Sequence, residues 1–215
     1  MAINPPRWDV RPDGSVFISH RNVKLAELDQ LASVRHLTLW NVTFDSGAPI
    51  AKLEKLQWLD IRGGTRQDLS VLEGCDQLAG VQINQVRNLT DISVLSELTG
   101  LRILSLYGLS SLMTLPEMGQ LKALRRLELG QLRSLADWQG LSTPPALEEL
   151  LFHNKLFPDL AVIEDLAKHP GLRSFEWIAP DEPARKVAAV RDLLHRDKAT
   201  IVLPDKWLAE NIERN

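Results

Sequence analysis

A histidine between two carboxylates is the arrangement in this sequence closest to a chemically active group. His153 stands between Glu128 and Glu176 at nearly equal separations, so a chain that repeats at that interval would bring the three side by side. Such a group could bind a metal ion weakly or supply a general base. A general base also needs a nucleophile within hydrogen-bond reach and a third group to orient it. We therefore expect a solvated histidine among carboxylates, and an enzyme centred on His153 is the least favoured function.

The lone cysteine, Cys75, excludes an intrachain disulfide and a cysteine-based zinc site of the usual four-ligand kind. It has no basic or histidine neighbour in the sequence that would activate the thiol, so we expect a small core residue. The glycines form neither a GxGxxG nor a GKS/T motif between a strand and a helix. The sequence predicts no cofactor and no metal site.

Composition is typical of a folded protein of the cytoplasm. The chain has 215 residues, 44% of them apolar and 25% charged, with a formal net charge of -3. Nucleic acids and anionic membranes attract clustered positive charge, so we expect neither as a partner. No window approaches the roughly eighteen apolar residues of a membrane span. The first residues lack the basic and then apolar pattern of a secretory signal, although a non-classical export route would leave no pattern.

Seven segments share the frame Φ-x-x-Φ-x-Φ, in which Φ is an apolar residue. They are residues 34–39, 56–61, 78–83, 101–106, 124–129, 147–152 and 172–177. Their first positions are separated by 22, 22, 23, 23, 23 and 25 residues. Alternation at the fourth and sixth positions is typical of a short strand with one buried face. Stacking each strand beside its equivalent would complete a parallel sheet and a continuous core.

The residues between these strands must return the chain to the start of the next strand. Gly, Ser, Asp and Pro interrupt most of the returns, which favours short 3₁₀ or irregular turns on the convex side. The return at residues 160–168 differs, because its apolar residues are spaced three to four apart and predict a helix.

The sequence resembles the leucine-rich-repeat family over residues 31–179. It is similar to short-repeat forms of bacterial proteins and of plant disease-resistance proteins, the latter especially in the run LSLYGLSSLMTLPEMGQLKALRRLEL. The resemblance implies an α/β solenoid with a concave parallel sheet, used for protein recognition. The family often has Asn or Cys at the ninth frame position. This chain instead has Val42, Gly64, Val86, Leu109, Leu132 and Lys155 there, which predicts a turn packed by apolar side chains.

Both ends of such a stack need a cap, because they would expose core and an unpaired strand edge. Residues 1–30 form the expected N-terminal cap, with a leading strand at residues 16–18 whose outer side Trp8 and Val10 would cover. Residues 180–215 form the expected C-terminal cap. It consists of an amphipathic helix at 183–196, a strand at 199–203 and a short helix from Pro204 that closes the stack.

The third, fifth and seventh frame positions should point outward on the concave face. Aromatic residues and arginine dominate the binding energy of protein interfaces, and several lie in these rows. We therefore predict a protein-interaction module without enzymatic activity that binds an unidentified protein on this face. The expected contact residues are His36, Trp40, Trp58, Asp60, Arg62, Ile103, Tyr107, Arg126, Glu128 and His153.

Two alternatives remain for the same rows. The aromatic face could bind a glycan or another small ligand. The aromatic residues could also simply cover their neighbours, while the charged residues solvate the sheet. His36 and His153 are expected five repeats apart, on the order of 20–25 Å, so they cannot share one site.

Overall fold

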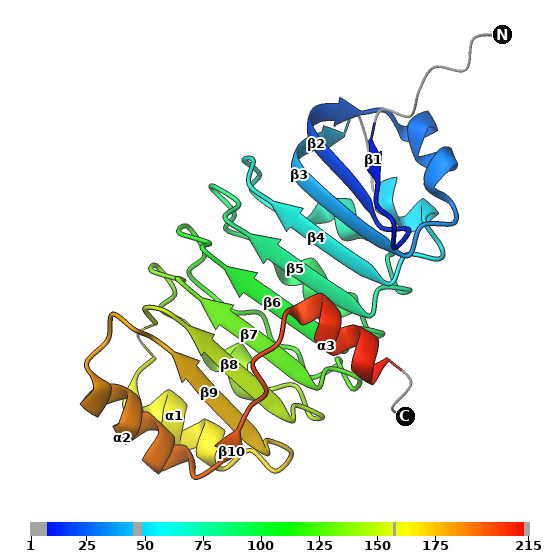
Figure 1. Cartoon of the computed structure of the whole chain (residues 1–215). Helices are drawn as coiled ribbons and strands as arrows, with labels where there is room; N and C mark the ends of the chain where they lie inside the picture. The colour runs from blue at the N-terminus through cyan, green and yellow to red at the C-terminus, as the bar shows by residue number, and fades with distance from the viewer. Residues whose placement is uncertain (1–7, 45–48, 157, 213–215) are drawn as a thin grey trace, which may run out of the picture.

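The chain forms one ten-stranded sheet whose strands follow the order of the sequence (Figure 1). The computed structural model describes residues 8–44, 49–156 and 158–212. The strands are β1 (Asp9–Val10), β2 (Val16–Val23), β3 (His36–Phe44), β4 (Trp58–Arg62), β5 (Gly80–Asn84), β6 (Ile103–Tyr107), β7 (Arg126–Gly130), β8 (Glu149–His153), β9 (Ser174–Ile178) and β10 (Asp197–Lys198). All neighbouring strands are parallel except β1 and β2.

Equivalent residues of successive repeats pair directly with one another. Leu37 pairs with Leu59, Leu59 with Val81, and the same register continues to Phe175. The fourth and sixth frame positions are buried in every repeat from β3 to β9. A one-residue slip of any strand would turn this apolar set to the other face, so the alternation determines the register. The predicted α/β solenoid with its parallel sheet is confirmed.

A left-handed residue at the eighth frame position turns the chain at the end of each strand from β4 to β8. These residues are Gly63, Gln85, Gly108, Gln131 and Asn154, and the equivalent His20 and Asn41 share the conformation, with φ between 50° and 69°. Glycine and asparagine adopt it at low cost. The turn directs the ninth position inward in four repeats, where Val42, Val86, Leu109 and Leu132 are buried as the sequence predicted, whereas Lys155 at the same position is exposed.

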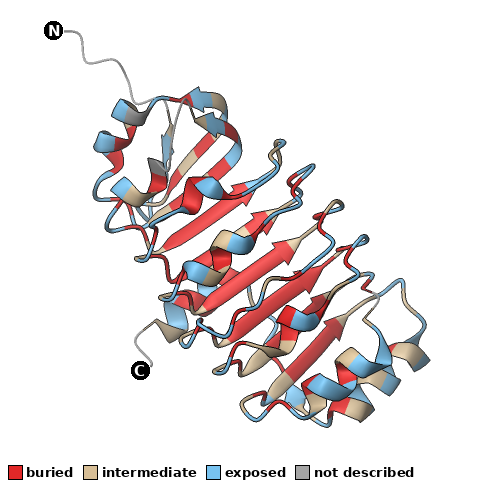
Figure 2. Ribbon diagram, turned by 180° about the vertical axis from the view of Figure 1, so that it is seen from behind, coloured by how far each residue is buried: buried red, intermediate tan, exposed pale blue. Residues whose placement is uncertain are grey.

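The returns cover one face of the sheet with short 3₁₀ turns (Figure 2). These turns span Leu25–Leu31, Pro49–Lys52, Ser70–Leu72, Ser93–Glu97 and Gln139–Ser142. The predicted helical return forms α1 (Leu160–Ala167), and α2 (Ala184–Leu194) packs against both α1 and β9. The opposite face, predicted to be concave and called the front face below, carries the third, fifth and seventh frame positions.

At the N-terminal edge, the leading strand is longer than predicted and extends over all of β2. The short strand β1 pairs with it from outside, and Trp8 packs against the core as expected, whereas Val10, the other residue of the expected cover, is 61% exposed. The first seven residues of the expected cap lie outside the described residues.

The C-terminal segment departs from the prediction in two ways. The predicted strand at residues 199–203 does not form, and only Asp197 and Lys198 pair with β9. The last helix, α3 (Pro204–Asn211), does not close the end of the stack. It lies across the front face against β5 and β6 (Figure 1). Residues 199–212, called the strap below, therefore cover the middle of the face that the sequence predicted to be open.

No helix in residues 8–44, 49–156 and 158–212 combines the length and apolar character that crossing a bilayer requires.

Phe152 is the side chain on which the aromatic part of the core depends. Its ring packs edge-on against Phe175 and Trp177, with centroids 5.3 Å and 6.1 Å away. We expect Phe152→Ala to lower the free energy of unfolding by about 3–5 kcal/mol, because it leaves a cavity that the stacked repeats cannot close. Urea unfolding measures the change, and Met113→Ala, at a side chain 61% exposed, should stay within about 0.5 kcal/mol of the parent. A loss for Phe152→Ala as small as that of the control would contradict this packing.

Candidate functional site

The strap buries three side chains that the sequence predicted to be exposed contact residues. Trp58 is 4% exposed, and Ile103 and Arg126 are fully buried. All three occupy the third frame position, the row over which the strap passes. The prediction of exposure is wrong for these three, and also for Asp60 and Glu128, which are 2% and 4% exposed. Strand periodicity decides which face a side chain points to, but not what later packs on that face.

An apolar cluster holds α3 to the sheet. Trp207 and Leu208 of α3 pack on Trp58, Ala79 and Ile103, apart from the main core. Gly80 provides the space between them. A Cβ atom there would come within 2.4 Å of the Trp58 ring and 2.9 Å of Leu208 Cδ2. A glycine where other repeats carry larger side chains was the sequence signal that another segment approaches the sheet at this point.

Arg126 connects the strap to the charged part of the front face. Its Nε donates to Glu128 Oε1 at 2.7 Å and its Nη1 to Glu149 Oε2 at 2.7 Å. Nη1 also donates to the carbonyl oxygen of Thr200 at 3.0 Å, and the guanidinium lies over the Trp207 ring. The buried charge is thus balanced by two carboxylates and hydrogen-bonded to the main chain of the strap.

Asp60 is a buried carboxylate with one oxygen left free. Arg62 Nε donates to Asp60 Oδ2 at 2.6 Å, while the buried Oδ1 has no hydrogen-bond partner among the described residues. Burial raises the pKa of Asp60, and the hydrogen bond from Arg62 opposes that rise only in part. Arg62 itself reaches solvent with about half of its side chain.

The group around His153 assembles only in part. His153 Nε2 lies 3.6 Å from Glu128 Oε2. Glu176 instead forms an ion pair with Arg191 of α2 and accepts a hydrogen bond from its neighbouring backbone N–H. The three side chains considered from the sequence therefore do not form one site. Within the part of the chain that the structure describes, no three histidine, cysteine or carboxylate side chains gather as a metal site would require.

The side chains at the seventh frame position of the strands, called the seventh-position row below, remain accessible beside the strap. Trp40 is 47% exposed and packs its ring against Phe17 and His20. Arg62 is exposed, while Tyr107 and His153 are half-buried. Asn154 Nδ2 donates to the Tyr107 hydroxyl at 2.6 Å, which fixes the phenol ring along the face.

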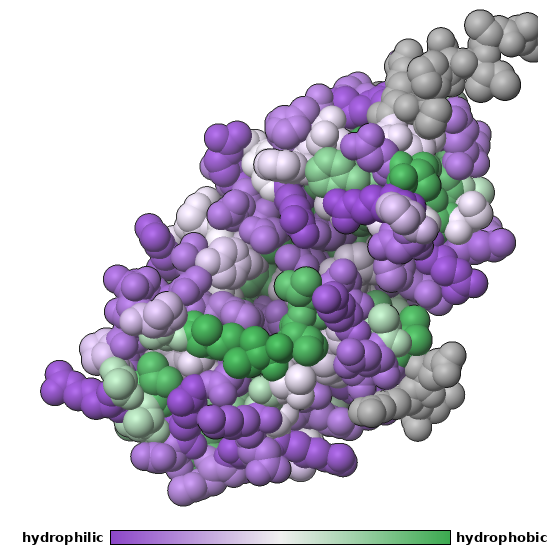
Figure 3. Space-filling view, viewed as in Figure 1, coloured by the Kyte–Doolittle hydropathy of each residue, from purple (hydrophilic) through white to green (hydrophobic). Residues whose placement is uncertain are grey.

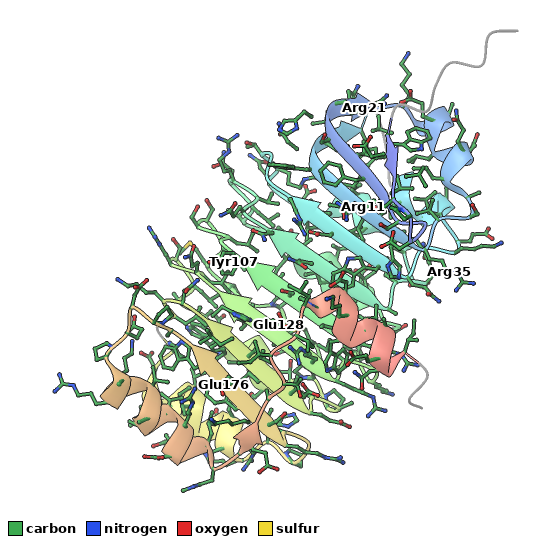
Figure 4. The ribbon with its side chains drawn as sticks, in the orientation of Figure 1. Arg11, Arg21, Arg35, Tyr107, Glu128 and Glu176 are labelled. Atoms are coloured by element: carbon green, nitrogen blue, oxygen red, sulfur yellow. The ribbon has the colours of Figure 1, made fainter. Side chains whose placement is uncertain are left out.

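The strap divides the front face into two hollows that share Gln82 and Pro204. The first has a volume of about 250 Å³ and is lined by Arg11, His36, Asp60, Arg62 and Asp205, among others. The second has about 360 Å³ and is lined by Tyr107, Glu128, His153 and Asn154, among others. Figure 4 shows the labelled Tyr107 and Glu128 on the face that α3 crosses. Eight of the ten predicted contact residues line these hollows or, like Trp40, stand beside them.

Cys75 takes no part in this face. It is fully buried in the main core, and burial raises the pKa of its thiol to about 12. The predicted role of a small, unreactive core residue is confirmed.

No protein-family model and no curated protein matches the sequence. Among solved structures, the chain is similar to an internalin from Listeria monocytogenes, with 20% identity and a TM-score of 0.43. The similarity covers 86% of this chain and 58% of the internalin chain.

The raised pKa of Asp60 predicts a pH-dependent stability. The folded protein binds the carboxyl proton of Asp60 more tightly than the unfolded chain does. The contribution of Asp60 to the free energy of unfolding therefore falls as pH rises from the ordinary pKa of 3.8 through the raised pKa of the folded protein. We therefore expect the melting temperature of the parent, minus that of Asp60→Asn, to decrease between pH 3 and pH 7. Thermal melts of both proteins at matched ionic strength test this, and a difference that grows over the same range would refute the assignment.

Proposed function

We propose that the protein is a protein-interaction module that binds a partner along the seventh-position row. The observation that carries the proposal is the exposed Trp40, followed along the same edge by Arg62, Tyr107 and His153. Large aromatics and arginine supply most of the binding energy in protein interfaces. A rigid sheet also presents them at fixed spacing, so that little side-chain freedom is lost on binding.

The other predicted contact residues receive secondary roles in this proposal. His36 and Asp60 line the first hollow and Glu128 the second, so that they would meet side chains of the partner that enter beside the row. Trp58 supports the strap and also lines the first hollow, whereas Ile103 and Arg126 support the strap and make no contact with this partner. The ion pairs of Arg62 with Asp60 and of Arg125 with Glu148 supply charges that would set the orientation of the partner.

A double variant at the start of the row tests the proposal. Trp40→Ala with Arg62→Gln removes the aromatic anchor and one charge but keeps a side-chain donor near Asp60. We expect the dissociation constant for the partner to rise at least tenfold, while the melting temperature changes by a few degrees only. The partner is first captured with the parent protein from cells, purified, and titrated against both proteins by calorimetry.

The matched control is Met113→Ala with Arg133→Gln, two exposed side chains on the returns. It should bind the partner as the parent does. A partner bound equally well by the row variant and the control would place the interface elsewhere. A row variant that unfolds would show that Trp40 and Arg62 are structural cover, which is the alternative that the sequence left open.

The second hollow favours one further candidate, a small polar ligand such as a glycan. Its volume lies in the range of small-molecule sites, and Tyr107 offers an aromatic ring beside the polar Asn154, Gln82 and Glu128. A sugar panel screened by thermal shift tests this candidate. We expect a ligand to raise the melting temperature of the parent but not that of Tyr107→Ala, and no shift with any sugar would remove the candidate.

A further inference from the structure

We infer that the strap is a replaceable occupant of a peptide-binding groove, formed by Trp58, Gly80, Ile103 and Arg126. The groove takes a segment of another protein that runs extended into a short helix bearing adjacent tryptophan and leucine side chains. This surface is distinct from the seventh-position row, so the inference does not depend on the function proposed above.

The strap packs on a surface that is complete without it. Its apolar contacts form a cluster of their own, whereas the leucines of the repeats bury one another in the main core. The residues below the groove also keep their charge partners when the strap leaves. Arg126 still has Glu128 and Glu149, so that opening the groove exposes a paired group to water and leaves no isolated buried charge.

The contacts between groove and strap are those of peptide recognition. Arg126 donates to the carbonyl oxygens of Thr200 and Val202, which are main-chain groups that any extended peptide presents. The helix that follows places Leu208 in the space above Gly80, and Trp207 Nε1 donates to Glu149 Oε1 at 3.2 Å. Main-chain hydrogen bonds supply affinity in this mode of binding, and the side-chain positions supply specificity.

These contacts specify the occupant. The apolar cluster buries one aliphatic and one aromatic side chain, and Glu149 favours an aromatic group with a hydrogen-bond donor, as the indole N–H of tryptophan provides. Val202 and Ile212 pack partly buried against the same cluster, whereas Ile201 and Leu203 are 63% and 60% exposed. Figure 3 shows an apolar strip along the path between β10 and α3 on an otherwise mostly polar face. The adjacent tryptophan and leucine, which the cluster buries most completely, are therefore the centre of the recognition motif.

A peptide in trans tests the inference with the full-length protein. The probe is a fluorescein-labelled synthetic peptide of residues 199–215, and binding is followed by fluorescence anisotropy. In the Leu208→Asp variant of the protein, a charge in the apolar cluster weakens the docking of its own strap. We expect this variant to bind the probe at least tenfold more tightly than the parent, in which the intact strap competes. A probe with Trp207→Ala should lose at least tenfold in affinity for the variant.

Two matched variants complete the design. Leu203→Asp makes the same change at an exposed position of the strap and should bind the probe no better than the parent. Adding Trp58→Ala to Leu208→Asp alters the groove and should abolish binding of the probe. If folded Leu208→Asp, verified by circular dichroism, binds the probe no better than the parent, the inference is wrong.

Hydrogen exchange of the parent protein provides a second measurement that needs no variant. A replaceable strap should open without the sheet, so the amides of α3 should exchange at least a hundredfold faster than those of β6. Equal protection of α3 and β6 would make the strap a fixed part of the fold and overturn the inference. A parent protein that elutes as a dimer, with Leu208→Asp monomeric, would also overturn it, since the occupant would then be a second copy of this chain.

Discussion

The register of the parallel strands is the constraint on which the structure depends. Each strand from β4 to β9 has only five residues and cannot bury its apolar face alone, so it is stable only where the fourth and sixth positions meet their equivalents in the next repeat. The left-handed residue at the eighth position makes this pairing repeatable, because it turns every strand from β4 to β8 in the same direction. A regular front face follows directly from that register.

The same regularity explains why the front face attracts a covering segment. Rows of side chains at a fixed strand spacing form long grooves, and the third-position row contains Trp58 and Ile103 with a glycine between them. Apolar side chains of this size in a groove favour burial by an amphipathic segment. In this chain the strap performs that burial, and the seventh-position row beside it stays open to other molecules.

Charge on the front face is arranged around buried carboxylates rather than spread over the surface. Glu128 connects Arg126, which lies under the strap, with His153 in the open hollow. Asp60 similarly stands between the exposed Arg62 and the first hollow. Ligands that enter either hollow therefore meet groups already positioned by hydrogen bonds, which lowers the entropic cost of recognition.

The sequence by itself determined the repeats, the inward leucines, the parallel sheet, and helices α1 and α2, because these follow from local spacing and from burial between neighbouring repeats. It also indicated that Trp40 and Trp58 point to one face. Only the tertiary structure decided that Trp40 is open and Trp58 is covered. The strap reaches Trp58 from more than a hundred residues away through one tryptophan, one leucine and the space above Gly80, and a contact at that separation leaves no periodic pattern.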